Sequence, residues 1–173
     1  NVYTDVIQFK GSHYDFGAMQ GELLQEGPLL SNHQKQWFSR PTHRFHINAL
    51  EFESIISSFA PLIYEEIIGL QDSLQMNIED AIRFSGGYYL EYVRNYDNDP
   101  LTYEGRLVLF QPTDGGYASI GPSMQITGRM DGINEYGLTM RYNFINTKQS
   151  ADGFMCNMIG RIILETCRTV DEA

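Results

Sequence analysis

Apolar residues recur at helical spacing through most of the first half of the chain. Val2, Val6, Ile7 and Phe9 predict a short strand before the helices begin. Ser12, followed three residues later by Asp15, resembles a capping box and predicts a helix that runs to Leu24. Three further helices are predicted: one at residues 48–59, one that begins at Pro61, and one at residues 78–84 after the cap Asn77. The helix from Pro61 has an apolar stripe at Leu62, Ile63, Ile67, Leu70 and Leu74.

Two glycines share one face of the first predicted helix. Gly17 and Gly21 are four residues apart. Each costs about 1 kcal/mol relative to alanine inside a helix. We therefore expect another backbone to pack closely against this face.

The second half of the chain changes to the period of β-strands. Short segments rich in β-branched and aromatic residues alternate with Asp-Gly, Gly-Gly and Gly-Pro pairs. They predict an antiparallel sheet, followed by a last helix at residues 153–168. Helices first and consecutive strands afterwards give an α+β plan. The predicted strands are 107–111, 117–120, 124–130 and 137–145.

Composition excludes several classes of protein. The 173 residues carry a net charge of −10 and two cysteines. This acidity disfavours nucleic acid and anionic membranes as partners, and two cysteines make no disulfide framework. No apolar run approaches the length of a membrane span, and the start of the chain has no signal-type stretch. We expect one soluble, cytoplasmic domain.

The sequence lacks most of the common catalytic and nucleotide-binding motifs. The chain has no P-loop, no dinucleotide fingerprint, no HExxH and no GxSxG. His33, His43 and His46 lack the thiols or carboxylates of a zinc site, so we expect neither metal nor cofactor. Cys156 and Cys167 share an apolar face of the last predicted helix, which favours structural roles over nucleophilic ones.

The segment from Val93 to Pro100 carries mixed chemistry. As a strand it would place Arg94 on one face and Asp97 on the other. Taken alone, it is most simply an edge strand with a surface ion pair.

Three motifs in order change that interpretation. They are Gly11-Ser-His-Tyr-Asp-Phe-Gly17, Arg94-Asn-Tyr-Asp97, and Asp131-Gly-Ile-Asn-Glu-Tyr-Gly-Leu138, the last followed by Arg141-Tyr-Asn143-Phe. Together they resemble the acyltransferase and choloylglycine hydrolase branch of the N-terminal-nucleophile (Ntn) hydrolases. The resemblance is closest to bacterial relatives of acyl-coenzyme A:6-aminopenicillanate acyltransferase, the self-cleaving C45 peptidase group, and it extends over nearly the whole chain.

The resemblance implies a four-layer αββα fold and a cysteine chemistry. In this family a cysteine exposed by self-cleavage attacks an amide carbonyl, and its own α-amino group acts as the base. By analogy, Arg94 would favour the thiolate, Asp97 would orient the α-amine, and Asn143 would donate to the oxyanion.

The chain departs from the family pattern at the nucleophile. The family cysteine precedes the Arg-Asn-x-Asp strand by a hairpin, yet Tyr92 runs directly into Val93 here. We expect a segment with the catalytic cysteine to be missing between Tyr92 and Val93, and the C-terminus to be truncated. Residues 1–92 would then be a helical pre-cleavage region and residues 93–173 the sheet core and last helix of one incomplete domain.

The expected function is cleavage or transfer of a non-peptide amide through a thioester. The partner would be a small-molecule amide, with a homo-oligomer possible. The alternative is a noncatalytic small-molecule-binding domain of the same fold that lacks the nucleophile.

Overall fold

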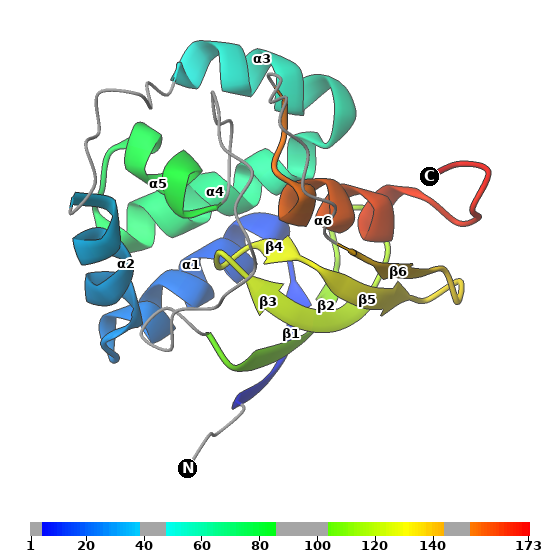
Figure 1. Ribbon diagram of the computed structural model, residues 1–173, viewed down its shortest axis with the longest axis horizontal. Coiled ribbons are helices and arrows are strands. Elements are labelled where there is room, and N and C mark those ends of the chain that lie inside the picture. The colour runs from blue at the N-terminus through cyan, green and yellow to red at the C-terminus, as the bar shows by residue number, and fades with distance from the viewer. Residues whose placement is uncertain (1–4, 39–47, 86–103, 144–152) are drawn as a thin grey trace.

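The computed structural model describes residues 5–38, 48–85, 104–143 and 153–173 (Figure 1). Two main layers are visible, a group of helices and a twisted sheet. The helices are α1 (His13–Gln25), α2 (Leu29–Phe38), α3 (Ala49–Phe59), α4 (Pro61–Leu74), α5 (Ile78–Phe84) and α6 (Cys156–Thr166). The strands are β1 (Asp5–Gly11), β2 (Arg106–Pro112), β3 (Ser119–Met124), β4 (Gly128–Arg129), β5 (Asp131–Asn134) and β6 (Thr139–Arg141).

The predicted helix starts are confirmed by their caps. Asp15 N donates to Ser12 Oγ over 3.1 Å, and the Ser12 hydroxyl in turn donates to the Asp15 carboxylate. Asn48 and Asn77 cap α3 and α5 in the same way through their side-chain oxygens. Pro61 is the first residue of α4. Helix α2 was not predicted, because its polar sequence shows no clear apolar stripe.

The sheet is mixed, which corrects the antiparallel prediction. The strand order is β1-β2-β3-β5-β6, with β4 paired to β3. Strands β1 and β2 pair in parallel, and the other neighbours are antiparallel. Because nearly a hundred residues of mostly helical chain separate β1 from β2, the chain can return to the same end of the sheet, as a parallel pair requires.

Three predicted strand boundaries are wrong. The pair Gly121-Pro122 was taken to separate two strands but lies inside β3, which runs on to Met124. The predicted strand 124–130 is broken by a turn in which Gln125 and Ile126 both have positive φ, 51° and 64°. The pair Asp131-Gly132 was taken for a turn but lies inside β5. Gly132 serves packing instead, since a Cβ there would lie 2.6 Å from Leu164 Cδ1 of α6.

Helices α1 and α4 pack backbone to backbone, as the glycines predicted. A Cβ at Gly17 would overlap the carbonyl oxygen of Glu66, and one at Gly69 would overlap that of Tyr14. The two glycines thus face each other's helix at one crossing. A Cβ at Gly21 would come 2.6 Å from the Ser73 hydroxyl one turn further along.

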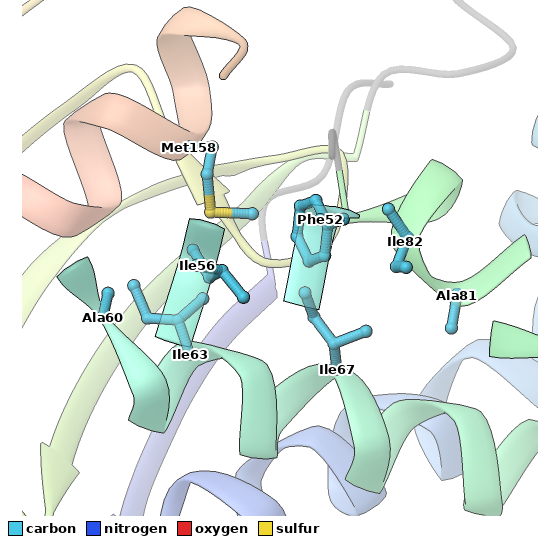
Figure 2. Close-up of a cluster of buried hydrophobic side chains, with 8 residues drawn as sticks. All are labelled: Phe52, Ile56, Ala60, Ile63, Ile67, Ala81, Ile82 and Met158. Atoms are coloured by element: carbon cyan, nitrogen blue, oxygen red, sulfur yellow. The ribbon is translucent and has the colours of Figure 1, made fainter. Parts of the chain in front are cut away.

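The largest hydrophobic cluster joins three helices to α6 (Figure 2). Met158 of α6 points toward Ile56 of α3 and Ile63 of α4 in this view. The buried members of the cluster are Phe52, Ile56, Ala60, Ile63, Ile67, Ala81, Ile82 and Met158. Helix α6 is therefore held by the helical layer on one side and by β4, β5 and β6 on the other.

The two faces of the sheet differ. The helix-facing side carries buried Val108 and Phe110, which pack with Phe16 of α1. We call the opposite side the outer face. Alternation and register place on it the apolar residues Val6, Leu107, Leu109, Ile120, Pro122 and Ile133 and the polar residues Gln8, Lys10, Gln111, Asp131, Thr139 and Arg141. All of these side chains are exposed or only half-buried.

The architecture is α+β, as predicted. Among the described helices, none has the length and apolar character needed to cross a membrane.

The α1–α4 crossing leads to a first prediction. Gly17→Ala should destabilise the protein by about 2–3 kcal/mol, because the new methyl group meets backbone that cannot move aside. Gly27→Ala is the matched control, since a Cβ there meets nothing within 4 Å. Urea unfolding of both variants checks this, and equal stabilities would contradict the close packing.

Candidate functional site

Asn143 lies just beyond the end of β6. Tyr142 N donates to Met130 O over 2.9 Å. Because Met130 immediately precedes β5, the hydrogen bonding between these two segments continues one residue past Arg141. Exposure alternates from Thr139 to Asn143, with Met140 and Tyr142 half-buried and the others exposed. Asn143 therefore belongs to the outer face of the sheet, where its amide is accessible to solvent.

The motif Asp131–Leu138 forms the hairpin that holds β6 in place. Gly137, with φ of 81°, makes the turn between β5 and β6. Glu135 extends the pairing with β3, since its backbone N donates to Ala118 O and its side chain accepts from Ala118 N over 3.0 Å. Gly132 lets α6 approach the hairpin.

Asn134 is the centre of this motif. Its Oδ1 accepts from the backbone N–H groups of Tyr136 and Leu138, both at 3.1 Å. Its Nδ2 donates to Leu164 O and Cys167 O at the end of α6, at 3.0 and 2.7 Å. One buried side chain thus closes the turn and satisfies two carbonyls of the helix end. The motif that carries the resemblance is a scaffold for β6 and for Asn143 beyond it.

Behind the sheet, a buried guanidinium joins the layers. Arg161 of α6 donates to Glu66 of α4, with Nη2 2.5 Å from Oε2, and its Nε pairs with Glu165. Its Nη1 donates to Thr127 O over 2.7 Å. The guanidinium also lies over the rings of Phe16 and Phe110, 5.7 and 5.2 Å from their centroids. All three ionic side chains are almost fully buried.

These contacts shift the pKa values in the directions that ion pairing requires. Burial alone would lower the pKa of Arg161, yet Glu165 and Glu66 raise it above its usual value. Burial likewise opposes ionisation of Glu165, but Arg161 and His13 hold the pKa of this carboxyl below its usual value. Burial raises the pKa of Glu66, although Arg161 pulls it the other way. Glu66 still accepts from Gln20 Nε2 over 2.7 Å, so both of its oxygens have a donor.

His13 extends this network to the start of α1. Its Nδ1 is 2.7 Å from Asp114 Oδ1, and its Nε2 is 2.9 Å from Glu165 Oε2. Both carboxylates need a donor, so the imidazole is protonated on both nitrogens. Burial lowers the pKa of His13, but the hydrogen bonds and charges of Glu165 and Asp114 outweigh burial and raise it above 6.5.

His13 and Arg161 form ion pairs with the three acids of this network, Glu66, Asp114 and Glu165. Arg129 adds a third positive charge nearby, and its Nη1 donates to the carbonyls of Thr127 and Gly128. Burial and the nearby Arg161 lower the pKa of Arg129 to about 9, which leaves it charged at neutral pH. An imidazolium with both protons engaged is a poor general base, so this cluster ties elements together and does not transfer protons.

Only part of the predicted site lies within the described residues. Arg94, Asp97 and the join between Tyr92 and Val93 lie outside the described residues. Asn143 is described and exposed. Cys156 is the first residue of α6, whereas Cys167 lies past its end with extended backbone, so the two do not share a helix face as predicted. Neither cysteine has a histidine partner among the described histidines, His13 and His33.

Sequence reasoning missed the buried network, although a sign of it was present. Glu66 lies three residues after Ile63 and four before Leu70, within the apolar stripe of α4. Arg161 lies three residues from both Met158 and Leu164 in α6. Opposite charges inside two apolar stripes indicate a buried ion pair.

The fold and the hairpin motif define an α+β protein whose sheet displays an amide side chain on its outer face. Comparison with protein families identifies it further. The family model described as acyl-coenzyme A:6-aminopenicillanic acid acyl-transferase matches residues 87–173. The chain belongs to this family, which confirms the resemblance to Ntn-type acyltransferases. A search of curated proteins finds no match.

The doubly bonded imidazolium leads to a second prediction. Because the pKa of His13 is raised in the folded state, its contribution to stability is complete below about pH 6.5 and is lost as pH rises through the folded pKa. The free energy of unfolding should therefore fall as the pH rises above about 6.5. Urea unfolding at several pH values measures this fall.

His13→Gln should remove this pH dependence, and His33→Gln should keep it. Burial lowers the pKa of His33, so its titration makes stability rise with pH and cannot produce this fall. Identical pH dependence in both variants would contradict the role given to His13.

Proposed function

We propose that this protein is a cysteine-dependent Ntn amidohydrolase or acyltransferase that acts on a non-peptide amide through a thioester. The observation that carries the proposal is family membership together with the position of Asn143. The family motif fixes the β5–β6 hairpin, and the hairpin presents the amide of Asn143 to solvent on the outer face. An exposed side-chain N–H just beyond a paired strand is suited to stabilising an oxyanion.

The apolar residues of the outer face support the finer fold assignment, a four-layer αββα sandwich. The helical layer and the sheet would be two of the four layers. A second sheet would cover Val6 and Ile133, which are 72% and 42% exposed, and the half-buried Leu107 and Leu109. The site would then lie between the two sheets, on the side that carries Asn143.

The proposed chemistry assigns a role to each candidate residue. The thiolate of an N-terminal cysteine, expected between Tyr92 and Val93, attacks the amide carbonyl and forms the C–S bond. Arg94 favours the thiolate, and Asp97 orients the α-amine that takes the thiol proton. Asn143 donates to the oxyanion, after which the C–N bond breaks and the amine leaves with that proton. Water or a second amine then releases the acyl group.

Assays of amide turnover test this function. The protein that contains this chain should release product from at least one of penicillin V, a conjugated bile salt and an N-acyl homoserine lactone. Hydrolysis and acyl transfer both pass through the thioester. With an acceptor amine added, transfer gives an amide of that amine, whereas hydrolysis gives the free acid, so the product distinguishes the two reactions. No turnover of any of these amides would favour the alternative, a noncatalytic small-molecule-binding domain. That alternative is supported by the direct run from Tyr92 to Val93, which contains no cysteine.

A third prediction concerns Asn143 itself. Asn143→Ala should lower kcat by about 100-fold to about 1000-fold, because the transition state loses one oxyanion donor, and KM should change little. Stability should stay within about 0.5 kcal/mol, since the side chain is exposed. Thr139→Ala, at an exposed position of β6 itself, is the matched control and should keep full activity. Equal kcat values for the two variants would remove Asn143 from the mechanism.

A further inference from the structure

A cavity of about 200 Å³ lies where four parts of the chain meet. Its walls come from the α3–α4 corner at Phe59–Ile63, the β2–β3 connection at Gly116 and Tyr117, the start of α1 at His13, and the end of α6 at Glu165 and Thr166. It lies on the helix-facing side of the sheet, near the end where β2 turns into β3.

The sequence explains why this space is empty. Gly115 and Gly116 have φ of 131° and 81°, a conformation that side-chain-bearing residues rarely adopt. A Cβ at Gly116 would lie 3.5 Å from the His13 ring and 3.6 Å from Glu165 O, in the space between them. Ala60, which also lines the cavity, adds only a methyl group. The small side chains in the lining thus leave the space open.

The floor of the cavity carries charges that are already paired. Both nitrogens of His13 bind carboxylates, and Glu165 accepts from His13 and Arg161. A charged ligand would therefore find no unpaired partner there and would lose its own hydration. The remaining lining side chains are mostly apolar, and one of them, Phe59, is a 65% exposed aromatic ring. An exposed phenylalanine beside a hollow favours contact with a ligand ring.

We propose that this cavity is a binding site for a compact, uncharged, largely apolar molecule about the size of one six-membered ring. An enclosed cavity of about 150 Å³ is enough to hold benzene, so this pocket of about 200 Å³, which is open to solvent on one side, has room for a molecule of that size. The site is separate from Asn143, because β6 ends beside the start of β5, at the opposite end of the sheet from the β2–β3 turn. Its occupancy does not depend on the proposed amide chemistry.

Benzyl alcohol is a suitable probe, with glycerol as a polar control that has no ring. Titration into the purified ¹⁵N-labelled protein should give saturable shifts of the Gly116 and Tyr117 amides with benzyl alcohol and none with glycerol. Phe59→Ala should weaken binding by about fivefold, because the ring contact is lost. Leu50→Ala is the matched control, since Leu50 is a 78% exposed apolar residue on the same helix and does not line the cavity.

Leu62→Trp gives a second and independent test, because the larger side chain fills the cavity. It should abolish the saturable shifts while the melting temperature shows that the protein still folds. Leu23→Trp, at a 42% exposed position of α1, is its control and should bind normally. Shifts that do not saturate, or that persist unchanged in both Phe59→Ala and Leu62→Trp, would overturn the proposal.

Discussion

The arrangement of the layers depends on the ion pairs of Arg161. This guanidinium lies between Glu66 of α4 and Glu165 of its own helix, and it also donates to Thr127 O beside the sheet. Removing a charge from water costs several kcal/mol, and pairing offsets this cost only when the geometry satisfies both partners. The positions of α4, α6 and the sheet are therefore tied to one another, because moving any of them would leave a buried charge unpaired.

His13 carries the same constraint to the start of α1 and the β2–β3 turn. Its two bonds to Asp114 and Glu165 fix the end of the sheet that lies farthest from Asn143. Asn134 fixes the other connection, from the β5–β6 hairpin to the end of α6. The polar side chain at the centre of the hairpin, Asn134, thus has a structural role, while the exposed position just beyond β6, Asn143, is the one suited to binding a reacting group.

Local signals in the sequence were sufficient for most helices. The helix caps could be predicted because Ser12, Asn48 and Asn77 each bind a backbone N–H three residues further along the chain. The role of Gly17 could be predicted because it depends on a single close approach of another backbone. The parallel pairing of β1 with β2 could not, because it depends on contacts a hundred residues apart. The turn at Gln125 and Ile126 was missed for a similar reason. Its backbone is held by Glu104, which accepts from Ile126 N over 2.8 Å, and neither residue type favours positive φ. Of the candidate site, family motifs indicated Asn143, and only the fold showed which face of the sheet presents it.

The presence of an N-terminal cysteine nucleophile is tested most directly by the intact mass of the protein, expressed from its full coding sequence and purified. Self-cleavage predicts two fragments, the second of which begins with cysteine and runs into the Arg94–Asp97 motif. A single uncut chain without a cysteine ahead of that motif would contradict an Ntn enzyme and would leave a binding domain of the same family.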